Sequence, residues 1–259
     1  MNPSLGTQAR TVARRSISRT LRQPAVVIPN VIFPLFMLAV LSKAGDQATK
    51  IPHFPTKSYL TFVLGATMVQ GATSAATLAG GMLAEDMEGG FMSRLLLTPV
   101  RQAVLIIAQL AGVAIVGFVQ SGIFLGIGLA FGATVKAGVG GALVLLAVAV
   151  LLVLTFGAIG LMVGAMAGST AQVQALTGLF VALMFMSSML MPRNLIAHDW
   201  FKTIATYNPI SYLVEATRSL LIEGWDGEAL ALGCGIAAIG LVLALTVATL
   251  SLRRTLERT

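Results

Sequence analysis

Charged residues gather in one short segment, residues 84–101, between two long apolar runs. Their side chains suit ion pairing with a partner: Glu85, Asp86, Glu88, Arg94 and Arg101. Gly89 and Gly90 interrupt the acidic part, and we expect Gly89 to adopt a left-handed conformation where the chain turns. Thr98-Pro99 matches a helix N-cap followed by proline at the first helical position. A charged, capped helix-turn-helix of this kind can be held by a protein outside the bilayer. An ordinary loop between two spans is the alternative interpretation.

Side chains that would carry catalysis or bind a metal are scarce elsewhere. An intramembrane enzyme or a proton-coupled transporter would require ionisable side chains at bilayer depth. The apolar runs have no Asp, Glu, Lys, Arg or His deep inside. The single cysteine, Cys234, excludes an intrachain disulfide and a thiolate metal site, and His53 and His198 stand alone in expected loops. No G-x-x-x-x-G-K-[ST] loop occurs, so ATP would have to be hydrolysed by another chain. We therefore expect no catalytic residue, metal or cofactor in this chain.

The composition is that of an all-α integral membrane protein. Of 259 residues, 56% are hydrophobic and 10% are charged, whereas a soluble domain has about a quarter charged residues. Apolar runs of about 20 residues cross a hydrocarbon core as helices. The net charge is +7, but the chain has no soluble basic face that could bind nucleic acid. We therefore interpret the positive charge as a signal of the orientation of the chain in the membrane. No cleavable signal peptide is expected.

Six membrane-spanning helices are expected, with one polar interruption. Their approximate limits are 24–41, 58–83, 102–132, 139–167, 172–191 and 228–252. Residues 192–227 are too polar to span, and Asn208-Pro209 marks a helix start within them, so we expect two short external helices that do not cross. Two ridges of small residues should allow close helix packing: Gly122-xxx-Gly126 in the third span and Gly160-xxx-Gly164-xxx-Gly168 in the fourth.

A basic amphipathic helix should precede the first span, within residues 1–23. It contains Arg10, Arg14, Arg15 and Arg19, and its apolar residues fall mostly on another face. This pattern is typical of a helix that lies on the membrane surface with its arginines toward anionic headgroups. An arm that binds nucleic acid is the alternative interpretation.

Arginine distribution predicts the orientation. An even number of spans places both chain ends on one side, and residues 84–101 fall on the same side. Ten of the 17 basic residues then lie there. The positive-inside rule makes that side cytosolic and the 192–227 hairpin external.

Two sets of polar or flexible residues within the spans are candidates for a substrate path. They are Thr73, Ser74 and Thr77 of the second span and Met184, Ser187 and Ser188 of the fifth. Hydroxyl groups in membrane helices usually bond their own backbone or a neighbouring helix, and methionines usually fill gaps. Ordinary helix packing is therefore the competing interpretation.

Three motifs resemble the permease subunits of type-2 ABC exporters. They are Glu85-Asp86-Met87-Glu88-Gly89-Gly90 with Arg94-Leu95-Leu96-Leu97-Thr98-Pro99, then Asn208-Pro209-Ile210-Ser211-Tyr212 with Arg218, and, more weakly, Arg22-Gln23-Pro24. Their order and spacing cover essentially the whole chain. Without a large external domain, the chain is most similar to the daunorubicin-resistance-type drug and lipid exporters. One departure is that family members often read Glu-Arg-Glu-x-Gly-Thr, where this chain has Asp86 and Gly89-Gly90.

The resemblance implies a half-transporter with one transmembrane domain, residues 1–259, in the bacterial plasma membrane. Two such permeases, identical or homologous, would pair, and each would sit on a cytosolic ABC subunit that binds ATP and Mg²⁺. The coupling contacts would fall on Glu85, Asp86, Glu88, Gly89, Arg94, Thr98 and Pro99, beside the N-terminal helix. Asn208, Pro209, Tyr212 and Arg218 would belong to the external hairpin.

The resemblance leaves the substrate open. Amphipathic drugs or lipid-like compounds fit best, and export of polysaccharide or lipid-linked glycan is the nearest rival. Two Trp and three Tyr argue mildly against a glycan channel with an aromatic mouth. A non-transporting membrane scaffold is an alternative from another class, and a neighbouring gene for an ATPase would separate it from an exporter.

Overall fold

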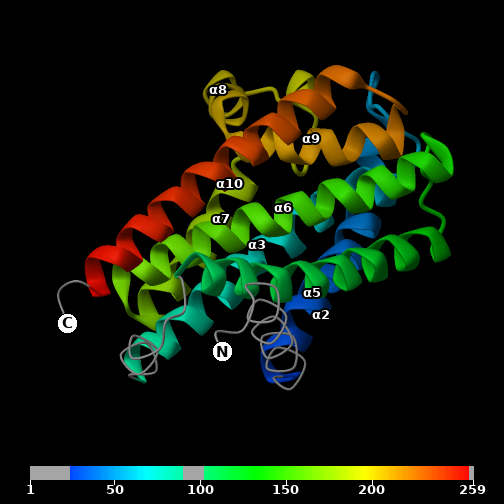
Figure 1. Ribbon diagram of the computed structural model, residues 1–259. Coiled ribbons are helices and arrows are strands. Elements are labelled where there is room, and N and C mark those ends of the chain that lie inside the picture. The colour runs from blue at the N-terminus through cyan, green and yellow to red at the C-terminus, as the bar shows by residue number, and fades with distance from the viewer. Residues whose placement is uncertain (1–23, 90–101, 257–259) are drawn as a thin grey trace.

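The computed structural model describes residues 24–89 and 102–256, and their regular structure is entirely helical (Figure 1). The α-helices are α2 (Pro24–Ala44), α3 (Tyr59–Glu88), α5 (Gln102–Ala130), α6 (Gly138–Ala167), α7 (Thr170–Phe185), α8 (Asp199–Tyr207), α9 (Pro209–Ile222) and α10 (Gly227–Leu256). Two short 3₁₀ helices, η1 (Asp46–Lys50) and η2 (Arg193–Leu195), lie in the loops. The expected N-terminal helix and the helix start at Thr98-Pro99 fall outside the described residues.

In the part of the chain that the structure describes, four helical segments are long and apolar enough to cross a membrane. They are Tyr59–Glu88, Gln109–Ala130, Gly138–Ala167 and Gly227–Leu252. Two shorter apolar helices, Ile28–Ala44 and Thr170–Phe185, occupy the places of the expected first and fifth spans. The chain is thus a multi-pass membrane protein, and the full number of six crossings stays a prediction.

The expected limits of two spans were wrong. The helix of the second span continues through Glu88, so the acids of the 84–101 segment begin on the last turn of α3. The fifth span was drawn to residue 191, but α7 ends at Phe185. Ser187 donates its hydroxyl to the Met184 carbonyl at 2.5 Å, and its N–H bonds the same carbonyl. Serine side chains compete for backbone partners in this way, and here the helix gives way to a turn.

The helix α3 lies at the centre of the bundle and packs against α2, α5, α6, α7 and α9. Its closest neighbour is α6, and glycines make the approach possible. A Cβ added to Gly160 would lie 1.9 Å from the Ala76 carbonyl oxygen, and one on Gly164 would lie 2.7 Å from that of Gly80. The ridge predicted in the fourth span is confirmed at these two positions. Gly168 instead ends α6 in a left-handed conformation, with φ +60°.

The ridge predicted in the third span makes no close contact with the described residues, and packing of this ridge against another chain stays a prediction. A Cβ on Gly122 or Gly126 would meet nothing within 4 Å among the described residues. The close approaches of α5 use Gly117, against Val153, and Gly128, against Leu64. Spacing identified glycines on one helix face, but a different face meets the neighbouring helices.

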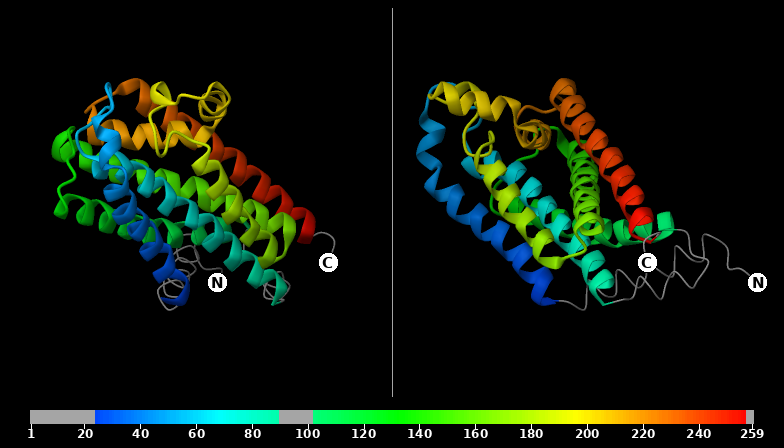
Figure 2. Two further views of the ribbon diagram at one scale, coloured as in Figure 1. Left: turned by 180° about the vertical axis from the view of Figure 1, so that it is seen from behind. Right: turned by 90° about the vertical axis from the view of Figure 1, so that its left-hand side faces the viewer.

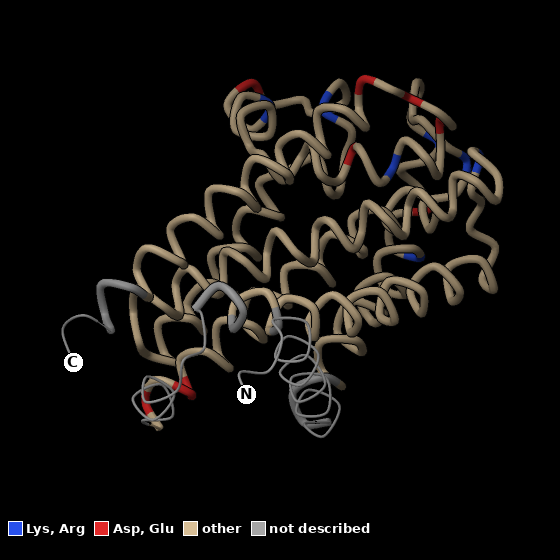
Figure 3. The backbone as a smooth tube through the Cα atoms, in the orientation of Figure 1, with Lys and Arg blue, Asp and Glu red and all other residues tan. Residues whose placement is uncertain are grey.

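The bundle has two polar ends and an uncharged middle (Figure 3). At one end, named here the α9 end, α8 and α9 lie across the tops of the long helices with η1 and the turn between α5 and α6 (Figures 1 and 2). At the other end, named here the coupling end, α3 and α10 finish and α2 and α7 begin (Figure 2). Charged residues of the described chain gather at these two ends, as expected for helices that cross a hydrocarbon core (Figure 3).

Candidate functional site

The Asn208-Pro209 pair starts α9, as predicted, and also ties it to α7. The Asn208 side-chain oxygen accepts a hydrogen bond from the Ile210 N–H at 2.9 Å, and Pro209 occupies the first turn of the helix. The amide nitrogen of the same side chain donates to the Leu183 carbonyl at 2.6 Å. One buried carboxamide therefore caps α9 and donates a hydrogen bond to a carbonyl near the end of α7.

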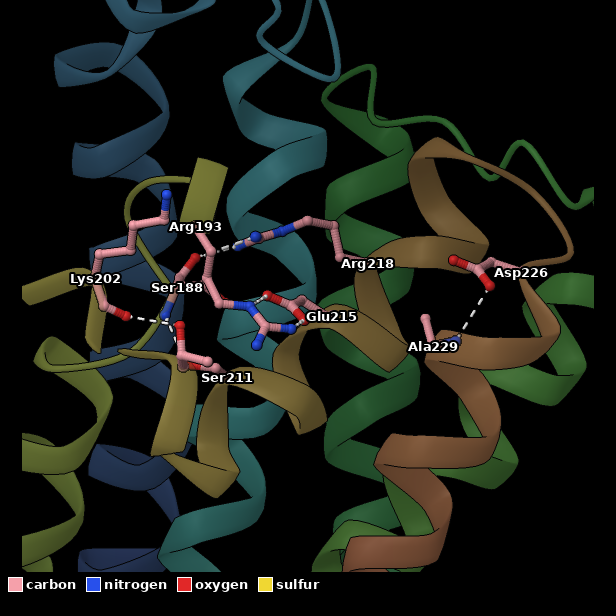
Figure 4. Close-up of polar contacts among 9 residues, drawn as sticks. Ser188, Arg193, Lys202, Ser211, Glu215, Arg218, Asp226 and Ala229 are labelled. Carbon is pink, nitrogen blue, oxygen red and sulfur yellow. Dashed lines mark hydrogen bonds and ion pairs between the residues drawn. The ribbon is translucent and has the colours of Figure 1, made fainter. Parts of the chain in front are cut away.

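Arg218, on the buried face of α9, is the centre of a cluster of polar groups from α9, α3 and the turn after α7, named here the polar cluster. Only 7% of its surface is exposed. Its guanidinium donates to the carbonyls of Phe62 at 3.2 Å, Ser188 at 3.1 Å and Met189 at 3.0 Å, and lies 3.5 Å from the centre of the Phe62 ring. Figure 4 shows the side chain extended from α9 toward the turn that holds Ser188. Burial lowers the pKa of Arg218 to about 9, with Glu215 partly opposing the shift.

Two further side chains hold the turn after α7. The Ser211 hydroxyl of α9 accepts a hydrogen bond from the Ser188 N–H at 3.1 Å. The Tyr59 hydroxyl of α3 donates to the Leu190 carbonyl at 2.8 Å. Arg218, Ser211 and Tyr59 thus satisfy polar backbone groups that a buried turn would otherwise leave without partners. The Ser188 hydroxyl itself is buried and has no hydrogen-bond partner among the described residues.

A second arginine closes the cluster toward solvent. Arg193 forms an ion pair with Glu215, with its Nε 2.7 Å from a carboxylate oxygen (Figure 4). It also lies 4.5 Å from the centre of the Tyr212 ring. Partial burial lowers the pKa of Arg193, but hydrogen bonds with Glu215 and Tyr212 outweigh burial and raise it above its usual value. Tyr212 and Arg218 had been expected in the hairpin. Arg193, Glu215 and Tyr59 were missed, because their partners are distant in sequence.

A polar cavity of about 350 Å³ opens beside these residues. Its walls include Arg193, Glu215, Arg218, Glu223 and Asp226. Burial, followed by the neighbouring Asp226, raises the pKa of Glu223 above its usual range. Within the described ranges no group of three His, Cys, Asp or Glu side chains could hold a metal ion. The arrangement offers charged contacts and structural hydrogen bonds.

At the coupling end, the acidic segment is joined to α7. Glu85, Asp86 and Glu88 lie on the last turn of α3. Glu88 accepts a hydrogen bond from the Thr170 N–H, at the start of α7, at 3.1 Å. Gly89 follows with φ −76°, so the left-handed conformation expected for it is wrong. The backbone angle at Gly89 itself does not require glycine. Arg94, Thr98, Pro99 and the N-terminal arginines lie outside the described residues.

The candidate path residues in α3 make local or interhelical bonds. Thr73 and Ser74 donate to the Gln70 and Gly71 carbonyls of their own helix, at 2.7 Å and 2.6 Å. The Thr77 hydroxyl lies 2.6 Å from that of Thr177 and links α3 to α7. These bonds are the ones that the packing interpretation predicts.

The remaining path candidates lie at or just beyond the end of α7. Met184 is buried in the core. Ser187 and Ser188 lie in the turn after α7, whereas the sequence had placed them within the helix. A role for any of the six residues in a substrate path stays a prediction.

These contacts make α7 a link between the two polar ends. Glu88 holds its first turn, Thr77 holds its middle, and Asn208 and Arg218 hold its last turn and the residues that follow. A displacement of the acidic end of α3 would therefore reach the α9 end through one short helix. The arrangement is suited to transmitting movement between the two polar ends.

Comparisons with known proteins agree with the sequence resemblance. A family model described as ABC-2 type transporter matches residues 7–222, which include the acidic end of α3 and the whole of α9. The chain is also similar to the probable doxorubicin resistance ABC transporter permease protein DrrC of Mycobacterium tuberculosis, in strains CDC 1551 / Oshkosh and ATCC 25618 / H37Rv. The identity is 24% over 211 residues, which cover 81% of this chain and 75% of the relative.

Proposed function

The chain belongs to the ABC-2 type transporter family, and we propose that it exports amphipathic compounds with energy from ATP hydrolysed by a separate subunit. Membership makes it an ABC transporter permease of the daunorubicin-resistance type, a membrane subunit that is not itself catalytic. The further parts of the proposal are the substrate class, the energy coupling and the partners.

The observation that carries the proposal is the hydrogen bond from Thr170 to Glu88. A cytosolic ATP-binding subunit would contact the acidic end of α3 and the residues after it. When two such subunits close on ATP and Mg²⁺, movement of this end would pull directly on α7. Because α7 is also bonded to α9, the pull would change the packing at the α9 end. This gives a physical route from ATP hydrolysis to the opposite membrane face.

The assembly we propose has two permeases and two ATP-binding subunits in a bacterial plasma membrane. Both termini and the coupling end would face the cytosol, and α8 and α9 the outside. The second permease would be identical or homologous. The apolar surfaces of α2 and α5, with exposed residues such as Phe36 and Phe118, would contact lipid or the second permease.

The proposed substrates are amphipathic drugs or lipid-like molecules. One support is the similarity to a protein named for doxorubicin resistance. Another is the middle of the bundle, where the described chain has no Lys, Arg, Asp or Glu (Figure 3) and which suits a substrate that is itself largely apolar.

Inverted membrane vesicles provide the test. The chain is expressed with a candidate ABC ATP-binding subunit from the same genome, and doxorubicin uptake is followed by fluorescence. ATP should drive accumulation in vesicles that hold both proteins, and vesicles with either protein alone should show none. Copurification of the two proteins without ATP-dependent uptake would reject the substrate class. Failure to copurify would reject the partnership.

A further inference from the structure

A groove lies between α2 and α5 near the α9 end, with the start of α3 as its base. Its volume is about 390 Å³. The two helices are joined farther from this end, where the Gln120 side chain of α5 donates to the Asn30 carbonyl of α2 at 3.0 Å. Beyond that bond, the groove is lined by residues 35–43 of α2 on one side and by the end of α5 with the following Phe131 on the other. The groove is separate from the polar cluster around Arg218.

The walls of the groove are apolar, and its charge is confined to one edge. Leu35, Leu38, Leu60, Ile127 and Phe131 form the apolar part, and Phe131 is 78% exposed. An elongated hydrocarbon chain fits these walls because it covers their apolar surface and needs no hydrogen bonds.

The polar edge carries one cation and one anion, Lys43 and Asp46. Neither side chain forms an ion pair with a residue of the described chain. The two hydroxyls beside them each make one hydrogen bond within the chain, because Ser42 donates to the Ala39 carbonyl and Ser58 accepts from the Thr61 N–H. The ammonium and the carboxylate are therefore the charged groups that a ligand can bind at this edge.

The backbone between these two charges is held in place. Gly45 lies between them and packs so closely on Tyr59 that an added Cβ would be 2.1 Å from the ring. Tyr59 is itself buried and bonded to the Leu190 carbonyl. Lys43 and Asp46 thus extend from a fixed turn at the end of an apolar groove.

We propose that the groove binds one zwitterionic phospholipid of the surrounding bilayer. An acyl chain lies along the apolar walls, the phosphate contacts the Lys43 ammonium, and the headgroup ammonium contacts the Asp46 carboxylate. The charged edge lies at the ends of the spans, at the depth of lipid headgroups. A headgroup with both charges matches both side chains, whereas a purely anionic headgroup would be repelled by Asp46. The inference does not depend on the transported substrate.

Photo-crosslinking of the full chain in lipid nanodiscs tests this site. The probe is phosphatidylethanolamine with a diazirine on one acyl chain, in a background of phosphatidylethanolamine and phosphatidylglycerol. Peptides from residues 35–43 and 127–131 should be labelled. Lys43→Ala should lower that labelling about fivefold, the effect of one lysine at a membrane surface. Asp46→Ala should also lower it. Lys50→Ala, on the same loop but outside the groove, is the matched control and should leave labelling unchanged.

Competing occupants give different results. Equal labelling in the Lys43 and Lys50 variants would overturn the proposal, as would stronger labelling by a phosphatidylglycerol probe carrying the same diazirine. Crosslinks from these residues to a second copy of the chain in place of lipid would make the groove a subunit interface. Displacement of the lipid probe by doxorubicin would make it a substrate site. Thermal unfolding of each variant is measured alongside, and loss of labelling supports the proposal only in variants that unfold as the parent does.

Discussion

The Glu88 carboxylate, at the end of α3, accepts a hydrogen bond from the backbone N–H of Thr170, the first residue of α7, at 3.1 Å. The first N–H groups of a helix have no partner within it, and its N-terminus favours negative charge. Glu88 thus caps a helix that begins 82 residues later. The contact joins the charged segment found in the sequence to a helix that the sequence did not connect with it.

Replacing Glu88 should separate coupling from stability. Glu88→Ala removes the cap at an exposed position, so unfolding should cost about 1 kcal/mol less. Drug-stimulated ATP hydrolysis by the reconstituted complex should fall much more, because α7 no longer follows α3. Glu88→Gln keeps an acceptor oxygen and should retain more stimulation. Full stimulation in Glu88→Ala would show that this bond carries no movement.

The two glycines at the ends of α3 and α6 should respond differently to alanine. Gly89 has φ −76°, and an added Cβ would lie 3.1 Å from the Glu85 carbonyl oxygen, so Gly89→Ala needs only a small shift. Gly168 has φ +60°, which costs an L-residue about 1 kcal/mol or more. Thermal unfolding in detergent should show a lower Tm for Gly168→Ala than for Gly89→Ala. The reverse order would contradict the conformations of these two turns.

The contact between α3 and α6 should tolerate no side chain at Gly160. A Cβ there would lie 1.9 Å from the Ala76 carbonyl oxygen, so Gly160→Ala must push two central helices apart, at roughly 1–3 kcal/mol. Gly122→Ala is the matched control, since its Cβ would meet no described atom within 4 Å. Size-exclusion profiles and Tm should change for Gly160→Ala alone. An unchanged Gly160→Ala protein would remove this contact from the fold's essential features.

Stability should depend on pH through Glu223. Its pKa in the folded chain is raised from the ordinary 4.5 by burial and by Asp226. Between 4.5 and the raised value the folded chain binds more protons than the unfolded chain, so stability falls as pH rises through that window. Glu223→Gln should flatten this part of the Tm profile. Glu228→Gln, at the exposed start of α10, is the comparison and should leave the slope in place.

Local patterns predicted the helices well and their partners poorly. The length of the apolar runs and the Asn208-Pro209 pair act within a few residues, so the main helices and the start of α9 could be read directly. Gly122 and Gly126 have the same spacing as Gly160 and Gly164, but spacing cannot say which helix face meets a neighbour.

The end of α7 was also missed. It depends on serines that take backbone partners and on a turn held by Arg218 and Tyr59 from elsewhere in the chain. Contacts over such distances in sequence require the fold itself.

Arg218 provides the last test, because its cost of burial is offset by hydrogen bonds to three carbonyls. Arg218→Lys keeps a charge but presents one ammonium in place of a planar fork, and cannot reach the Phe62, Ser188 and Met189 carbonyls together. Arg218→Met fills similar volume and removes all three hydrogen bonds; the Phe62 carbonyl keeps its partner within α3, whereas the Ser188 and Met189 carbonyls lie in the turn after α7. Each buried group left unpaired costs roughly 1–3 kcal/mol, so Tm should fall in both variants and further in Arg218→Met.

The matched control is Arg193→Met, which breaks an ion pair whose side chains are each 25% exposed and which contributes about 1 kcal/mol. Limited proteolysis should expose the turn at residues 186–192 in the Arg218 variants and leave it protected in the Arg193 variant. If Arg193→Met were the more damaging change, the turn after α7 would be held by the ion pair with Glu215. Arg218 would then be a buried charge without a structural role.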